Sequence, residues 1–321
     1  MTRRYVLGRL WQTLPMLLGV VVVGFLLVHI APGDPILALA GENGDEAYYA
    51  AMRERFGLDR PLISQLWTYV SRLAQGDLGR STIQKQPVTD VILDRLPNTL
   101  LLAGTALVLS TTFGILAGVW AASRRGALRD HVVTTSAMLL YAIPVFWLGQ
   151  LAVLWFGLHW GWFPVQGRTD ARSDATGLAH FIDVAHHLAL PALVLASQQI
   201  AVVARLTRAT IIDELEAPHI DAARARGLPE ARILIRHALP AALLPVVTVV
   251  GNRVGHLVSG AVVVEIVFGW PGIGRLLVAA TTDRDIPVLL GLFLLIGFAV
   301  LMANLLTDLS YKRLDPRIRI G

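Results

Sequence analysis

Polar residues that interrupt a long apolar stretch near the C-terminal end are the first candidates for a functional site. Asn252, His256 and Ser259 recur at spacings that place them on one face of a helix. Arg253 lies beside that stripe, and Glu265 follows further along the same stretch. Ionisable side chains inside a membrane span usually face a bundle interior or a water-filled cavity. The stripe therefore indicates a translocation path, or a structural ion pair with another helix or chain.

No arrangement typical of an enzyme accompanies this stripe. Ser81 and Ser136 have no nearby His–Asp arrangement, and no carboxylate pair suits hydrolysis, so we expect no catalytic residues. The histidines at 180, 186 and 187 raise the alternative of a metal site, but no thiolate or dense carboxylate cluster accompanies them. We expect neither a metal nor a cofactor.

An ATP-binding loop is also absent from the sequence. Its only lysines are Lys85 and Lys312, and neither follows a glycine, so the G-x-x-x-x-G-K-[ST] phosphate loop cannot form. If ATP drives the protein, another polypeptide must bind it.

The composition is that of an all-α polytopic membrane protein. Of 321 residues, 55% are hydrophobic and only 16% are charged, with a mean hydropathy of +0.59, whereas soluble domains carry about 25% charged residues. The net charge of +5 does not indicate nucleic-acid binding, because the arginines cluster between apolar segments. Cysteine is absent, which excludes disulfides and thiol chemistry.

Six apolar segments are long enough to span a membrane. The first, Leu14 to Ile30, reaches about 20 residues when Leu10 and Trp11 are included, enough for ~30 Å of hydrocarbon. We interpret it as an uncleaved span, because a signal-peptide cleavage site at 38–40 would lie too far beyond it. The five others are Thr99–Ala122, Val133–Leu158, Ala189–Thr207, Pro240–Phe268 and Pro287–Leu309. We expect kinks at Pro144 and Pro245.

Arginines indicate the orientation of these spans. They are concentrated in the N-terminal segment, in the loops at 124–129 and 219–236, and in the C-terminal tail, which six spans place on one side. By the positive-inside rule that side is the cytoplasm, so both termini are expected there. Outside we expect 31–98, with helices at Asp45–Phe56 and Pro61–Leu73, the loop 161–187, and the connection 269–286, with a short helix at 275–280. This divides the chain into 1–98, a transmembrane domain at 99–309, and a tail at 310–321.

The basic loop between the fourth and fifth spans is predicted to form a helix, a break and a second helix. Asp221 to Arg226 are mostly good helix formers, and Gly227 follows where a helix end often needs a positive φ. Pro229 suits the first turn of a second helix ending near Ala238. Such a unit with exposed arginines would suit docking of a soluble partner, and an ordinary positive-inside loop with an amphipathic helix is the alternative.

The residues of this loop resemble the EAA loop of ABC-transporter permeases. The matching positions are Asp221, Ala222, Ala223, Gly227, Leu239 and Pro240. Two positions depart from the family pattern, since Asp221 replaces Glu and His237 stands where Ile or Val is usual. GLDRPLISQLWTYVSRLAQGDLGRS (57–81), GWFPVQG (161–167), GAVVVEIVFGWPGIGRLL (260–277) and LDPRIR (314–319) extend the resemblance over nearly the whole chain, toward the dipeptide/oligopeptide/nickel branch.

This resemblance implies a type I ABC importer permease in a bacterial inner membrane. Its expected partners are a second, different permease subunit, two ATP-binding subunits at the loop 219–239, and an external substrate-binding protein. The small residues at 222, 223 and 227 would let the loop approach an ATPase closely, unless the alanines merely favour helix. Glu265 belongs to the family pattern, whereas Arg253 and His256 depart from it. Peptides, nickel chelates and glutathione remain open as substrates, and the rival class is an ion-coupled secondary transporter.

Overall fold

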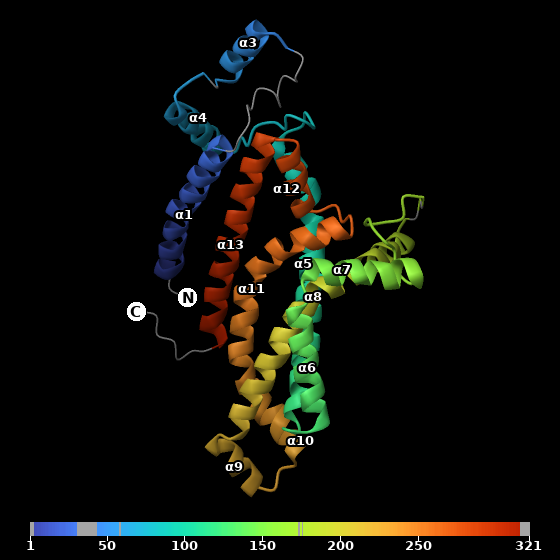
Figure 1. Ribbon diagram of the computed structural model, residues 1–321. Helices are drawn as coiled ribbons and strands as arrows, with labels where there is room; N and C mark the ends of the chain where they lie inside the picture. The colour runs from blue at the N-terminus through green and yellow to red at the C-terminus, as the bar shows by residue number, and fades with distance from the viewer. Residues whose placement is uncertain (1–2, 31–43, 58, 173, 175, 315–321) are drawn as a thin grey trace. The chain divides into compact units, whose positions relative to one another are not determined.

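The computed structural model of the chain describes residues 3–30, 44–57, 59–172, 174 and 176–314 (Figure 1). Within that part the protein is helical, and the only bridge of the β type is an isolated pair between Arg80 and Pro87. The all-α prediction is therefore confirmed for the described residues. Side chains are described throughout those ranges except at 3–14, 28, 55–56, 252–260, 303–304 and 306–314.

The helices follow one another along the chain with short connections. Those before the chain midpoint are α1 Arg3–Ile30, α3 Glu46–Phe56, α4 Leu62–Ala74, α5 Val88–Ala122, α6 Leu128–Ala142, α7 Val145–Ala152 and the π-helical segment η1 Val153–His159. Those after it are α8 Leu178–Leu215, α9 Pro218–Ala225, α10 Glu230–Ile233, the π-helical segment η2 Leu234–Ala238, α11 Leu239–Val267, α12 Ile273–Thr282 and α13 Ile286–Leu314.

The chain divides into two compact units, and α5 belongs to both. Unit 1 comprises Met1–Pro97 and Gly272–Met302, and unit 2 comprises Asn98–Pro271 and Ala303–Gly321. Unit 1 thus joins the N-terminal part of the sequence to a segment almost 200 residues later.

Unit 1 has an apolar core where the start of α5 meets α12 and α13. Val88, Ile92, Ile273 and Leu292 are almost fully buried there. A Cβ added to Gly291 would lie 2.7 Å from Val88 Cγ1, so α5 and α13 approach more closely than a larger residue would permit. The buried Asp285 carboxylate fixes the loop before α5, accepting bonds from the Ser81 hydroxyl and, at 3.1 Å, from the Thr82 amide.

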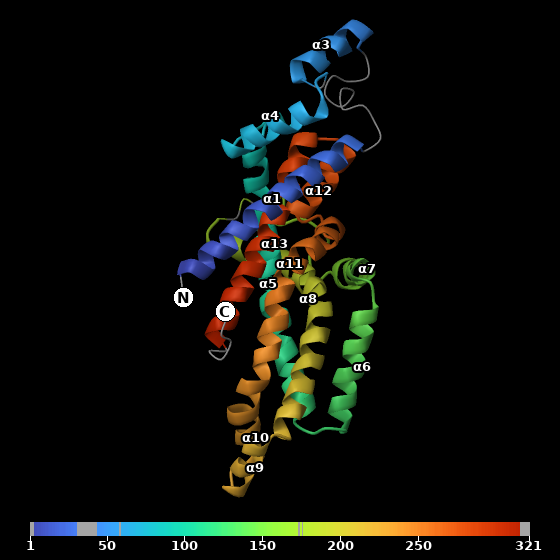
Figure 2. The same ribbon diagram turned by 90° about the vertical axis from the view of Figure 1, so that its left-hand side faces the viewer.

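The external helices predicted near the N-terminus are present in unit 1. Asp45 caps α3, its side chain accepting a hydrogen bond from the Tyr48 amide at 2.8 Å, and Gly57 ends the helix at φ 67°. Helix α4 lies across the C-terminal end of α1 (Figure 2). The observed ranges agree closely with the predicted 45–56 and 61–73.

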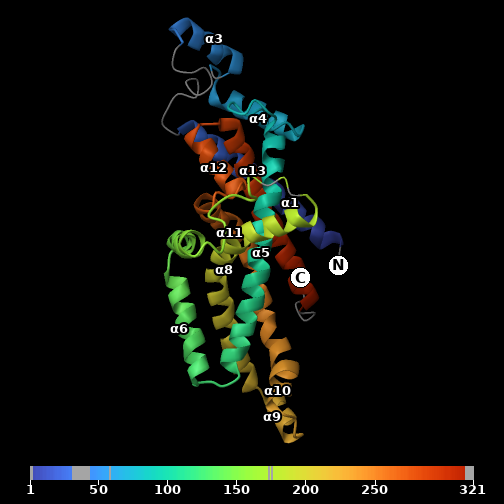
Figure 3. The ribbon, with the colours of Figure 1, turned by 90° about the vertical axis from the view of Figure 1, so that its right-hand side faces the viewer.

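Unit 2 is organised around α8, which packs against both α6 and α11 (Figure 3). Its core contains Leu102 and Ala106 of α5 together with Ala192 and Ala196 of α8, all buried. Helix α5 also approaches α8 very closely, since a Cβ added to Gly118 would lie 2.6 Å from Thr207 Cβ. The second predicted span is not one straight helix: α6 and α7–η1 meet at 100°, at the predicted break of Pro144 (Figure 1).

Three helices of the described part are long and apolar enough to cross a membrane, and a fourth span results if the bent α6–α7–η1 pair counts as one. The three are Val88–Ala122, Leu178–Leu215 and Glu230–Gly251, and shorter apolar helices cover Pro15–Leu27, Ile273–Thr282 and Ile286–Met302. Two helices begin well before the predicted spans, at Val88 instead of Thr99 and at Leu178 instead of Ala189. Hydropathy marks the apolar part of a helix, whereas backbone hydrogen bonding continues into its polar ends.

Candidate functional site

The predicted helix–break–helix is present, and we call it the elbow (219–239). Helix α9 begins at Pro218, whose missing N–H costs nothing in a first turn, and it ends before Gly227 at φ 74°. Pro229 is extended at ψ 143° and precedes α10. From there the helix continues through η2 directly into α11, so the second arm of the elbow and the next apolar helix are continuous.

The inner face of the elbow is a small apolar core. Ile220 and Ala223 of α9 are fully buried against Ile233 and Ala238, with Leu228 packed beside them. Ala223 therefore contacts its own chain in this structure, and its small size permits close packing between the two arms. Leu239 is half-buried and Pro240 is exposed at the start of α11.

Arg224 connects both arms of the elbow. Its guanidinium donates to Glu230 at 3.0 Å, to Asp221 at 3.3 Å and to the Leu215 carbonyl at 3.4 Å. The Glu230 carboxylate, followed by Asp221, raises the pKa of Arg224. Because the group is on the surface, we attribute to this network a fixed geometry and not a large stabilisation.

Two ion pairs secure the connection around the elbow. Arg125, in the loop between α5 and α6, contacts Glu216 at 2.8 Å, next to the start of α9. Asp130 of α6 is buried and forms a two-pronged contact with Arg208 of α8, with one N–O distance of 2.7 Å. The α5–α6 loop thus lies at the end of unit 2 that carries the elbow (Figure 3). Sequence reasoning did not identify this pair, although a lone acid beside Arg129 was an available signal.

The outer surface of the elbow is polar, basic and lined by small residues. Asp221, Ala222 and Gly227 are exposed there, and no atom lies within 4 Å of a Cβ added to Gly227. The exposed arginines of the same segment are Arg226, Arg232 and Arg236. A surface of this kind can receive an acidic, concave partner, and the α11 continuity would transmit a displacement along the helix.

The predicted polar stripe lies on α11, but four of its side chains are outside the described part. These are Asn252, Arg253, His256 and Ser259, whose backbone is helical. Glu265 is described and fully buried, and it accepts a hydrogen bond from the Thr99 hydroxyl at 2.6 Å. Its backbone carbonyl accepts from the Trp270 amide at 2.8 Å. Glu265 therefore lies in a packed junction between α5 and the end of α11.

The histidines of the 161–187 region are held by protein groups. His186 contacts the Trp162 carbonyl at 2.8 Å, and His187 contacts the Asp183 carboxylate at 3.0 Å. Across the described residues, no group of three or more His, Cys, Asp or Glu side chains could hold a metal ion.

Comparisons with known proteins agree in one family. Residues 114–320 match the model of the binding-protein-dependent transport system inner membrane component, and residues 1–103 match its N-terminal counterpart. The chain is 40% identical to the Di/tripeptide transport system permease protein DppB of Pseudomonas aeruginosa, with 98% of each chain covered. It is 38% identical to the Dipeptide transport system permease protein DppB of Escherichia coli K12 and 39% identical to the Glutathione transport system permease protein GsiC of the same strain, again with 98% coverage of each chain.

Solved structures support the same fold at lower sequence similarity. The MetNI methionine ABC transporter, in an inward-facing conformation, has a chain that matches with a TM-score of 0.56 at 17% identity, covering 71% of this chain and 97% of that one. An amino acid ABC transporter crystallised with histidines matches with a TM-score of 0.52 at 17% identity, covering 70% and 94%.

Proposed function

Since the chain belongs to the family of binding-protein-dependent transport system inner membrane components, we propose that it forms part of the translocation path for short peptides. It is a permease of an ABC importer, a transport component and not an enzyme. The observation that carries the peptide assignment is similarity over 98% of the chain to permeases named for dipeptides and tripeptides. Glutathione is itself a small peptide, so the permease named for it is consistent with the same substrate class.

The importer would consist of several polypeptides. Family membership implies ATPase subunits and a substrate-binding protein. We propose that two ATPase chains provide the hydrolysis and that a second, different permease completes the path, with this chain contributing the longer external segment. The complex would alternate between outward- and inward-facing states as the ATPases close and open.

The proposed topology has six spans with both termini in the cytoplasm of a bacterial inner membrane. Arginines in four separate segments support this orientation through the positive-inside rule. In this arrangement 1–98 supplies the first span and the external helices, 99–309 forms the transmembrane domain, and 310–321 is a cytoplasmic tail.

The elbow is the proposed docking site for the ATPase. Exposed Asp221, Ala222 and Gly227 would contact it, and buried Ala223 would keep α9 close to α10. Leu239 and Pro240 begin the helix that would carry the movement into the membrane. Nothing else in the described part combines an exposed basic turn with direct helical continuity into an apolar span.

The proposed path lies along the α11 stripe formed by Asn252, Arg253, His256 and Ser259, with Glu265 near its outer end. A charge facing lipid at position 253 would cost at least ~2.5 kcal/mol on insertion scales, which favours a wet cavity or an acidic partner. Replacing Arg253 with Gln should change the uptake rate or substrate preference while leaving complex yield intact. A fall in yield and thermal stability would instead identify a structural ion pair.

The proposed function is tested by uptake in proteoliposomes. The complex is purified through this chain, reconstituted with its binding protein, and supplied with labelled dipeptide. We expect uptake that requires internal ATP, and ATPase activity that rises when the liganded binding protein is added. Uptake driven by a proton or sodium gradient without ATP would establish a secondary transporter instead.

The substrate class is tested separately by mass spectrometry of molecules bound to the purified binding protein. Short peptides, glutathione included, are the expected ligands. A nickel chelate as the sole ligand would refute the peptide assignment while leaving the importer assignment in place.

A further inference from the structure

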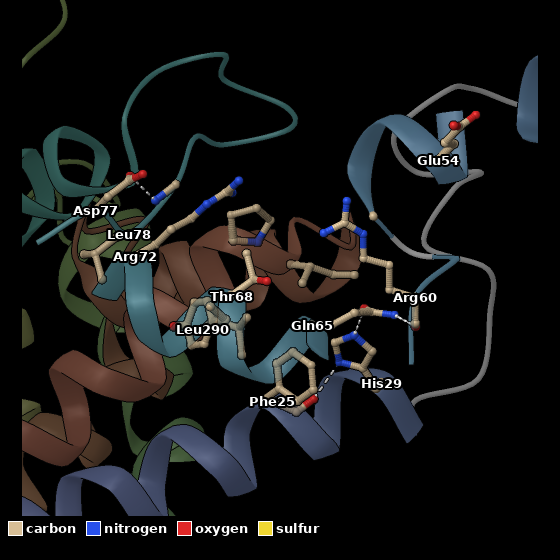
Figure 4. A pocket seen from close by; sticks show the side chains of 15 residues that line it. Phe25, His29, Glu54, Arg60, Gln65, Thr68, Arg72, Asp77, Leu78 and Leu290 are labelled. Carbon is tan, nitrogen blue, oxygen red and sulfur yellow. Dashed lines mark hydrogen bonds between the residues drawn. The ribbon is translucent and has the colours of Figure 1, made fainter. Parts of the chain in front are cut away.

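A hollow of about 300 Å³ lies in unit 1, beneath α4 and beside the C-terminal end of α1 (Figure 4). Its apolar wall includes Phe25 of α1, Tyr69 of α4 and Leu290 of α13. Phe25 and Tyr69 have ring centroids 6.2 Å apart and stack at a shallow angle. Burial raises the pKa of Tyr69 to about 12, so its hydroxyl stays neutral. One side of the hollow is therefore as apolar as the neighbouring helices.

The rim of the hollow is cationic. Arg60 and Arg72 stand toward opposite ends of it in Figure 4. Among the described residues, no carboxylate lies within ion-pair distance of either guanidinium. Of the two carboxylates at the rim, Asp77 accepts a bond from the Gly79 amide at 2.8 Å, and Glu54 points away from the centre. The arginines are thus available to an anion.

A hydrogen-bonded relay holds the floor of the hollow in place. His29 Nδ1 lies 2.8 Å from the Phe25 carbonyl, and His29 Nε2 lies 3.2 Å from Gln65 Oε1. The Gln65 amide nitrogen in turn donates to the Arg60 carbonyl at 2.9 Å. This relay connects α1 to α4 and fixes the backbone that carries Arg60, so the arginine is presented from a defined position.

The other face of α4 is apolar and unusually exposed. Ile63 is 75% exposed and Trp67 is 73% exposed, and Leu62 lies beside them at 53%. These residues recur with helical spacing, whereas the pocket-facing residues lie on the opposite side of α4. Exposed apolar side chains also continue onto α1, where Leu27 and Ile30 are 58% and 75% exposed. Tryptophan and aliphatic residues on one face of such a helix are typical of a helix lying in the headgroup layer of a membrane.

We propose that the hollow holds the phosphodiester headgroup of an anionic phospholipid, with Arg60 and Arg72 on the phosphate and the apolar face of α4 in the membrane interface. Guanidinium groups bind phosphate oxygens with paired hydrogen bonds, which suits two arginines on either side of one headgroup. The apolar wall and the exposed face of α1 suit the beginning of the acyl chains. The placement in the outer leaflet rests on the topology that forms part of the proposed function.

The test measures phospholipid binding to the whole importer complex, extracted in a zwitterionic detergent and stripped of lipid. Phosphatidylglycerol is titrated, and the number of bound molecules is counted by native mass spectrometry. Arg60→Gln and Arg72→Gln should each weaken binding about fivefold, and the double variant about 25-fold. Arg60→Lys/Arg72→Lys keeps both charges and should lose much less. Lys85→Gln removes an exposed cation of unit 1 outside the hollow, and it should leave binding unchanged.

Three results would overturn the proposal. Unchanged phosphatidylglycerol binding by the double Gln variant would remove the arginines from the site. Displacement of the lipid by millimolar inorganic phosphate would identify a site for free anions. Displacement by a transported dipeptide would assign the hollow to the substrate. Because binding is measured without transport, a failure here is distinguishable from a failure of ATP-driven uptake.

Discussion

The Glu265 carboxylate shows how a charged side chain is accommodated inside unit 2. It is fully buried and accepts a hydrogen bond from Thr99 at 2.6 Å. Next to it, the indole of Trp270 donates to the Asn98 carbonyl at 2.9 Å, and the Asn98 side chain donates to the Pro271 carbonyl at 2.8 Å. Two consecutive residues of α5 are thereby joined to the segment that ends α11. A buried carboxylate requires such donors, because an unsatisfied one would be costly.

Replacing Thr99 with Val should lower the stability of unit 2 by about 1–3 kcal/mol, since the isosteric change removes a donor from a buried carboxylate. The measurement is the thermal unfolding temperature of the purified complex. Thr99→Ser is the matched control, because it keeps the hydroxyl and should remain close to wild type. Equal unfolding temperatures for the Val and Ser variants would show that this hydrogen bond contributes nothing to stability.

The sequence could predict that Glu265 is a special residue but not what it contacts. A carboxylate within a long apolar run is visible in the sequence and was assigned to the translocation path. Its partner Thr99 lies 166 positions away, on a helix whose facing side no local pattern specifies. The same limitation applies to the buried Asp285, whose donors at 81 and 82 precede it by more than 200 positions.

Helices α5 and α8 pack through two glycines spaced one helical turn apart. Cβ atoms added to Gly114 and Gly118 would lie 2.6 Å from Val203 Cβ and Thr207 Cβ, respectively. The Ala204 carbonyl would lie only 2.7 Å from the second of these atoms. Glycines at this spacing let helix backbones approach closely in membranes, where packing and not water exclusion drives association.

Gly118→Ala should destabilise the protein by about 1–3 kcal/mol, because the added methyl group meets the backbone of α8. Gly104→Ala on the same helix has nothing within 4 Å of the new methyl group, and it should be neutral or stabilising by up to ~1 kcal/mol. Thermal unfolding of the two variants under identical conditions provides the measurement. If Gly118→Ala unfolds at or above the temperature of Gly104→Ala, the close contact does not constrain the helix pair.

The sequence predicted most helices because each of them carries its own local signal. The break at Pro144, the turn at Gly227 and the capped helix after Asp45 follow from backbone chemistry. The polar extensions of α5 and α8 were missed, since hydropathy does not report where helical hydrogen bonding ends. The G-x-x-x-G spacing in α5 was a readable signal, but the sequence alone does not identify α8 as the helix that it faces.

At the scale of the whole molecule, the six-span topology predicts which residues are accessible from each side of the membrane. The chain has no cysteine, so single cysteines introduce a unique label. Asp59→Cys and His180→Cys should react with an impermeant thiol reagent added to intact cells. Ser123→Cys and Ala231→Cys should react only after the membrane is permeabilised. All four positions are exposed in the structure, so burial does not explain a missing reaction.

Labelling of Ala231→Cys from outside intact cells would contradict the orientation as a whole. It would place the elbow on the side opposite the ATPases. A reversed pattern confined to His180→Cys would instead contradict the predicted external loop between the third and fourth spans.

The elbow gives the most direct test of coupling between a separate ATPase and this permease. Gly227 is exposed at φ 74°, with no atom within 4 Å of an added Cβ. Gly227→Ala and Gly227→Trp share the strain of a left-handed residue, about 1–2 kcal/mol, and differ in bulk on the outer surface. The pair therefore separates an effect on the loop itself from an effect on a docked partner.

The decisive measurement is the amount of ATPase that copurifies with each Gly227 variant, together with ATP-driven peptide uptake by the same preparations. We predict near-normal attachment and uptake for Gly227→Ala. For Gly227→Trp we predict normal membrane levels but about tenfold weaker ATPase attachment, corresponding to about 1.4 kcal/mol of lost docking free energy, with uptake reduced in parallel. Full ATPase attachment and wild-type uptake in Gly227→Trp would contradict the assignment of the elbow as the coupling site.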